Sequence, residues 1–139
     1  MDIRAILQPL FVMALLNLVM WLWMYATRIP AMSKAGIEAQ DATRDSMQSL
    51  PPEVVRVADN YNHLFEQPTL FYAVALSIAL LGHVDSLHVG CAWAFAGLRI
   101  AHSLVQATIN LIALRFTLFS LSWLALALMI VRESISIFS

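Results

Sequence analysis

The sequence predicts an all-α integral membrane protein, folded as one four-helix bundle in which successive helices run up, down, up and down. Of its 139 residues, 60% are hydrophobic and only 12% are charged. The mean hydropathy is +0.75, more apolar than a soluble domain of this length could bury. The apolar residues also fall into four stretches, each near the length of about 20 residues that a helix needs to cross the hydrocarbon core.

The first expected span covers residues 5–27, an almost uninterrupted apolar run. A segment rich in charged and small polar residues follows, and we expect it to form one long loop over residues 28–55. Pro51 and Pro52 suit the first turn of a helix, and Glu53 is favourable at its N-terminal dipole. The second helix should therefore begin outside the membrane and continue as the span 60–81.

The third and fourth expected spans cover residues 87–111 and 116–137. The turn before the third span has the sequence GHVDS, and another short turn lies near Asn110 to Arg115. Short connections make consecutive helices antiparallel neighbours. We therefore treat residues 1–139 as a single transmembrane domain.

Lysine and arginine residues give the expected orientation. Two of them flank the outer ends of the spans, Arg4 and Arg132, whereas five lie on the side of the long loop: Arg28, Lys34, Arg44, Arg56 and Arg115. Because cytoplasmic loops carry the excess of basic residues, the long loop should be cytoplasmic and both termini should lie on the outer side of the membrane.

Several classes of partner and site are excluded. The net charge is −1 and there is no basic tract, so we expect no nucleic-acid partner. The lone Cys91 cannot form an internal disulfide. His83 and His88 flank Asp85 in an outer turn, but residues in such a turn are more often solvated than metal-bound, and we predict no metal site.

Polar side chains form a stripe at the start of the second span. Arg56, Asn60 and His63 have the spacing i, i+4 and i+7, with Glu66 one turn further at the flank of the same face. Polar residues within a membrane turn inward, toward partners or a wet cavity, because a charge at a helix centre costs about 2.5–3.5 kcal/mol on insertion scales. This stripe therefore predicts a polar wall inside the bundle.

The third span carries a second polar stripe. Arg99, His102, Gln106 and Asn110 follow one helical face at i, i+3, i+7 and i+11. Arg99 and Glu66 could form a buried ion pair that only fixes the packing of the helices. However, the arginines near the inner faces outnumber this carboxylate, which instead favours an anionic ligand.

These residues carry a resemblance to a known family. The segments RVADNYNHLFEQP and RIAHSLVQATINLIALR are similar to motifs of the MAPEG family, the membrane-associated proteins of eicosanoid and glutathione metabolism, and the order and lengths of the spans resemble that family over the whole chain. The resemblance implies a bacterial-type member that forms a homotrimer and binds glutathione between subunits near the cytoplasmic side. It also implies site residues: Arg56, Asn60, Glu66, Arg99 and His102 to hold glutathione, and Arg115 to support its thiolate.

The resemblance implies a glutathione-dependent enzyme, a transferase or peroxidase, that acts on lipophilic electrophiles entering from the bilayer. Some positions differ from those of catalytic relatives: Gln106 replaces a tyrosine, Phe116 replaces a residue that is often polar, and Asn62 or His63 could match the family motif in place of Asn60. Two alternatives therefore stay open: a non-catalytic protein that binds lipid or glutathione, and a structural membrane protein. The role of Arg28 and the lipophilic substrate are not fixed by the sequence.

Overall fold

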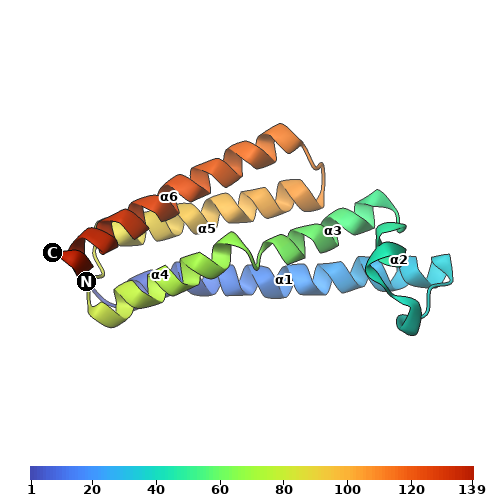
Figure 1. The fold of residues 1–139 in the computed structure, drawn as a ribbon, viewed down its shortest axis with the longest axis horizontal. Helices are drawn as coiled ribbons and strands as arrows, with labels where there is room; N and C mark the ends of the chain where they lie inside the picture. Colours follow the sequence, from blue (N-terminus) through green and yellow to red (C-terminus); the bar gives the residue numbers. More distant parts are fainter.

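The computed structural model describes residues 1–139 and is entirely helical. Its long helices lie roughly along one axis, with α1 beside the rod formed by α3 and α4, and α5 beside α6 (Figure 1). Both termini lie at the end of the molecule near the α4–α5 turn, whereas α2 lies at the other end (Figure 1). The elements are α1 (Arg4–Ala35), η1 (Ala39–Asp41), α2 (Arg44–Gln48), α3 (Pro52–His63), α4 (Gln67–Leu81), α5 (Ser86–Ala107) and α6 (Ile112–Phe138).

Three helical segments are long and apolar enough to cross a membrane: Arg4–Ala35, Pro52–Leu81 and Ile112–Phe138. Helix α5 has 22 residues, but it is not one of these segments. Its inward-facing polar residues, among them Arg99, His102 and Gln106, lower its hydropathy. Because α5 is packed between α1 and α6, much of its surface is covered by protein.

The segment expected to be a long loop is largely ordered. Helix α1 continues past residue 27 and ends where Gly36 takes a left-handed conformation with φ of 69°, which glycine adopts without steric cost. Helix α2 begins at a capping box, in which the backbone N–H of Ser46 donates to Oγ1 of Thr43 at 3.2 Å. The loop expected over 28–55 therefore contains short helices of its own, which local capping stabilises.

The second span begins at Pro52, as the two prolines predict, but it is not one continuous helix. Helix α3 ends at His63 and α4 begins at Gln67, which leaves a break visible between them (Figure 1). Pro68 has no N–H to donate to the carbonyl of Leu64, and its ring would clash with that carbonyl in a continuous helix. The break turns Glu66 away from the inner face on which the stripe had placed it.

The core is apolar along most of the bundle. The rings of Phe71 in α4 and Phe95 in α5 stack with centres 4.3 Å apart, and both side chains are fully buried. Helices α4 and α5 are joined by a short turn that begins at Gly82, where φ is 72°. The polar residues of the candidate site lie on α3, α5 and α6, near the end of the bundle opposite both termini.

Candidate functional site

Arg99 is the most unusual residue of the core. Its side chain is fully buried on α5, and none of its three guanidinium nitrogens has a hydrogen-bond partner in the chain. The predicted alternative, an Arg99–Glu66 ion pair, does not form, since neither residue makes a salt bridge with the other. A buried cation without a partner is costly, so this guanidinium is suited to an anion that the chain itself does not supply.

Other buried polar groups near this end of the bundle also lack partners. Both side-chain polar atoms of Asn60 are buried without a hydrogen bond, and so are Nδ1 of His102, Oγ of Ser103 and Oε1 of Gln106. Each such group normally costs about 1–3 kcal/mol, and folded proteins contain few of them. Together with Arg99 they form a set of donors and acceptors that suits a polar ligand.

A cavity of about 200 Å³ opens between α3, α5 and the first turns of α6, and His102 is the member of this set that lines it. The Phe119 ring lies 5.5 Å from the His63 ring and 6.1 Å from the His102 ring, measured between ring centres. It is also 5.9 Å from the guanidinium carbon of Arg99, so one aromatic ring connects the buried cation to the cavity. The lining residues are His63, His102, Ile112, Arg115, Phe116 and Phe119.

Arg115 lies in the first turn of α6, and the turn before it holds its side chain. Its Nη1 donates to Oδ1 of Asn110 at 2.7 Å, whereas its Nε has no partner. Asn110 was expected to continue the polar stripe of the third span, but α5 ends at Ala107 and Asn110 has a left-handed φ of 50°. Asparagine tolerates that conformation better than most residues, and here its amide directs a guanidinium toward the cavity.

Glu66 contacts a histidine rather than an arginine. Its Oε2 lies 2.8 Å from Nδ1 of His63, and the glutamate side chain is 68% exposed. The stripe had placed this carboxylate on the flank of the inner face, but the helix break leaves it at the surface beside the cavity. His63, one of the rival matches to the family motif, is the member of the pair that lines the cavity.

The predicted site residues are thus only partly brought together. His102 and Arg115 line one cavity. Arg99 lies against the Phe119 ring in the wall of that cavity. Glu66 contacts His63, which is also in the wall. Asn60 is buried on α3 without a contact to that cavity. Arg56 is half-buried with an unpartnered Nε, and it lines no cavity with the others. Arg28 lines a separate polar cavity of about 380 Å³ beside α2, together with Asn62.

Sequence reasoning missed Phe119, although its spacing of i+4 from Arg115 places both on one face of α6. It also missed a buried contact between α4 and α6, in which Oγ of Ser122 donates to Oε1 of Gln67 at 3.2 Å. Gln67 directly follows Glu66 but lies beyond the expected polar stripe. Ser122 and Gln67 are 55 positions apart, and no local sequence pattern predicts a contact over that separation.

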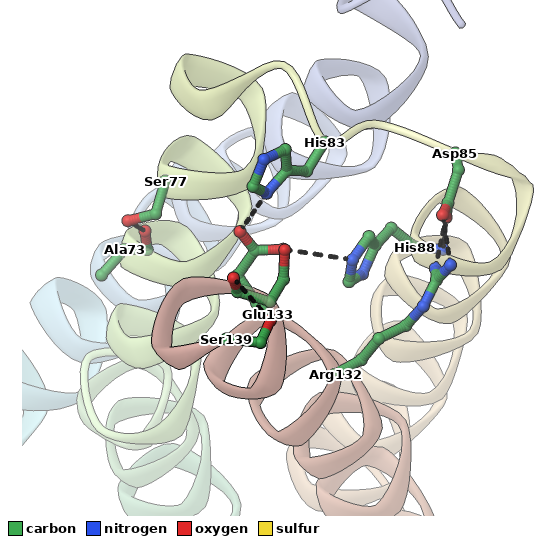
Figure 2. A network of polar contacts seen from close by, with 9 residues as sticks. Ala73, Ser77, His83, Asp85, His88, Arg132, Glu133 and Ser139 are labelled. Carbon is green, nitrogen blue, oxygen red and sulfur yellow. Dashed lines mark hydrogen bonds and ion pairs between the residues drawn. The ribbon is translucent and has the colours of Figure 1, made fainter.

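A second polar cluster occupies the opposite end of the molecule, where the α4–α5 turn meets α6 (Figure 2). Oε1 of Glu133 lies 2.6 Å from Nδ1 of His83, and Oε2 lies 3.4 Å from Nε2 of His88. Nη1 of Arg132 donates to Oδ1 of Asp85 at 2.6 Å. These contacts join two elements about 50 residues apart in sequence, so this cluster fastens the turn to the helix.

Asp85 also caps α5, because its Oδ1 accepts the backbone N–H of His88 at 2.9 Å. The Arg132 guanidinium and this N–H stabilise the charged carboxylate and lower the pKa of Asp85 to about 2. His83, Asp85 and His88 form no cluster suited to a metal ion. Their polar atoms instead contact Glu133 and Arg132 within the protein.

The chemistry of the first site follows from its groups. Guanidinium groups bind carboxylates through paired hydrogen bonds, and a guanidinium near a thiol favours the thiolate, which is the nucleophilic form. Phe116, Phe119 and Ile112 give the same cavity an apolar wall. The arrangement is therefore suited to a small anion placed next to an apolar second molecule.

The apolar helices define an integral membrane protein, with a cationic site between its helices at one end. Residues 6–133 match the model of the MAPEG family. The chain therefore belongs to the MAPEG family, as its motifs predict. Among curated proteins and among solved structures we found none that matches the chain.

Proposed function

We propose that this protein is a membrane-embedded, glutathione-dependent enzyme of the transferase or peroxidase type that acts on lipophilic electrophiles. The observation that carries the proposal is Arg99, a fully buried cation with no partner for any of its guanidinium nitrogens. Membership of the MAPEG family supports glutathione as the anionic thiol. Glutathione is the thiol substrate that the family resemblance implies.

The groups of glutathione match the groups of the site. Its carboxylates suit Arg99 and Arg56, and its ammonium group suits the free oxygen of Glu66. Asn60 and His102 offer buried polar atoms without partners in the chain. Arg115, half-buried at the cavity wall, would hold the sulfur as thiolate. The apolar wall formed with Phe116 and Phe119 suits a second substrate arriving from the bilayer.

We further propose that α5 is the fourth membrane crossing and that the protein assembles as a homotrimer, as the family resemblance implies. Residues beyond the small cavity, such as Arg56 and Arg28, would then act at subunit interfaces. The excess of basic residues on the side of the long segment 28–55 supports a cytoplasmic site, with both termini periplasmic in a bacterial inner membrane.

A glutathione titration of the purified full-length protein in nanodiscs tests the proposal. We expect saturable binding and an ultraviolet absorbance of the bound thiolate. Arg115→Ala should abolish the thiolate signal without changing assembly. Arg132→Ala provides the matched control, since it removes a half-buried arginine at the far end of the bundle and should leave the signal unchanged. Absence of glutathione binding in the unmodified protein would refute the proposal.

The second candidate function is a binding protein without chemistry. Gln106 favours it, because this buried residue replaces the tyrosine hydroxyl of catalytic relatives. Saturable glutathione binding without any thiolate absorbance would favour this second function over the first. A purely structural role is less well supported, since the ion pair between Arg99 and Glu66 that could fix the packing of the helices does not form.

A further inference from the structure

The contact between His63 and Glu66 resembles the arrangement of a base and the group that orients it. Nδ1 of His63 lies 2.8 Å from Oε2 of Glu66, and His63 belongs to the wall of the cavity that Arg115 also lines. An ionised carboxylate can only accept a hydrogen bond, so Nδ1 must carry the proton. The neutral ring then has its lone pair on Nε2, which makes no hydrogen bond with the chain.

The surroundings restrict the ring of His63. It stacks on Phe119, with an interplanar angle of 28°, and its centre lies 5.5 Å from that of the His102 ring. The charged or titratable groups around it come from three parts of the chain: Glu66 from the α3–α4 break, His102 and Arg99 from α5, and Arg115 from α6. Glu66 is the one carboxylate among them, so it alone favours a positive charge on His63.

The helix break positions this pair. His63 is the last residue of α3, and Glu66 is the residue before the first turn of α4. Pro68 causes the break, and the side chains of positions 63 and 66 then meet beside the cavity rather than inside the core. Glu66 uses one carboxylate oxygen for this contact, which leaves the other oxygen free to accept from the ammonium group of a ligand.

We propose that His63 is the proton acceptor for the bound thiol and that Glu66 is its positioning residue. This inference rests on the proposed function and deepens it. Nε2 of His63 takes the proton as the S–H bond breaks, and the electron pair of that bond stays on sulfur beside the Arg115 guanidinium. His63 becomes an imidazolium whose charge the Glu66 carboxylate balances. No oxidant or further reactant is needed.

The test measures how many protons are released when bound glutathione forms its thiolate. Transfer to His63 keeps the thiol proton on the protein, whereas a thiol that ionises without an acceptor releases its proton to the solvent. Glutathione is mixed with the full-length protein in weakly buffered nanodiscs, and a pH indicator and the thiolate absorbance are recorded together. His63→Gln should release about one more proton per thiolate than the unmodified protein. It should also raise the pH of half-maximal thiolate formation by about 1 unit, a tenfold lower thiolate fraction at fixed pH.

Two variants serve as controls. His83→Gln makes the same chemical change at the far end of the bundle, where His83 contacts Glu133, and should leave the proton count unchanged. Glu66→Gln keeps the shape of the side chain but removes the charge. It should shift the pH of thiolate formation in the same direction as His63→Gln, by a smaller amount, because His63 is still present.

A measurement on the unmodified protein does not depend on the folding of any variant. Nitrogen NMR of labelled histidines should show His63 with the proton on Nδ1 before glutathione is added and on both nitrogens afterwards. If thiolate forms while the His63 ring stays neutral, or if His63→Gln releases the same number of protons, His63 is not the acceptor and the proposed function still stands. If glutathione neither binds nor forms a thiolate, the proposed function and this inference fail together.

Discussion

The guanidinium carbon of Arg99 lies 5.9 Å from the centre of the Phe119 ring, a distance at which an aromatic face attracts a cation. A cation over an aromatic face gains roughly 2 kcal/mol when desolvated, less than the several kcal/mol that burial of an ion costs. Because all three nitrogens lack hydrogen bonds, the folded chain does not offset the free-energy cost of burying this charge. An anion with paired oxygens would offset it.

The first prediction concerns this cost. Arg99→Met should leave the Tm of the ligand-free protein unchanged or raise it, since a buried charge is replaced by an apolar side chain of similar length. The same variant should lose the stabilisation by glutathione, which is about 2.7 kcal/mol at a ligand concentration of 100 times Kd. Thermal unfolding in nanodiscs with and without glutathione measures both effects.

Arg99→Lys is the matched variant for that experiment. It keeps the charge but loses the planar fork that binds carboxylates with two hydrogen bonds, so it should retain only part of the stabilisation by glutathione. Strong destabilisation of the ligand-free protein by Arg99→Met would show that the guanidinium has a stabilising partner in the assembled protein, against our interpretation.

The second prediction concerns Asn110, which holds the Arg115 side chain from a left-handed backbone position. Asn110→Gly keeps this backbone conformation and removes the amide, so glutathione affinity should fall by about tenfold, equivalent to about 1.4 kcal/mol. Asn110→Ala should lower affinity equally and should also be less stable than Asn110→Gly by about 1 kcal/mol, because alanine has a Cβ that disfavours the left-handed conformation and glycine does not.

Calorimetric titration and thermal unfolding of these two variants separate the two roles of Asn110. Equal stability of the glycine and alanine variants would contradict the backbone argument. Unchanged glutathione affinity in both would show that Arg115 is positioned without the amide of Asn110.

The third prediction concerns Asp85 and acid stability. Its pKa is lowered to about 2 from an ordinary 3.8 by Arg132 and by the N–H of His88. A lowered pKa in the folded state means that the stabilisation is fully present above the ordinary value and is lost as the pH falls toward 2. The unfolding temperature of the native protein should therefore decrease over this acidic range more than that of Asp85→Asn.

Two substitutions at Asp85 distinguish its role as a helix cap from the effect of its charge. Asp85→Asn keeps an oxygen that can accept the N–H of His88, and it should destabilise the protein less than Asp85→Ala, which removes the cap at a cost of about 1 kcal/mol. Identical unfolding temperatures for the two variants at neutral pH would show that capping contributes nothing here.

The fourth prediction concerns Glu133, the buried carboxylate between His83 and His88. Glu133→Ala should destabilise the protein by about 1–3 kcal/mol, the cost of leaving buried polar groups without a partner, and should speed hydrogen exchange of the amides in the α4–α5 turn. Ser134→Ala, a change at the adjacent exposed position, serves as the control. Unaltered exchange in Glu133→Ala would mean that other contacts hold the turn.

Much of the fold could be predicted because it depends on local patterns. The apolar stretches predict membrane-spanning helices, and Pro51 and Pro52 predict the start of α3. The helical period correctly places Arg99, His102 and Gln106 on one buried face of α5. The family motifs also lie within single helices, so the MAPEG family could be identified from them.

The composition and the periodicity by themselves determined that this is a helical membrane protein with arginines and other polar groups on the inner faces of two helices, since hydropathy and helical phase are properties of short segments. Only the tertiary structure decided which of these groups meet. Glu66 contacts His63 rather than Arg99 because Pro68 breaks the helix between α3 and α4. Phe119 contacts His63, and Glu133 contacts His83, in each case across at least 50 positions of the sequence. Such pairings depend on how whole helices pack, which no local pattern contains.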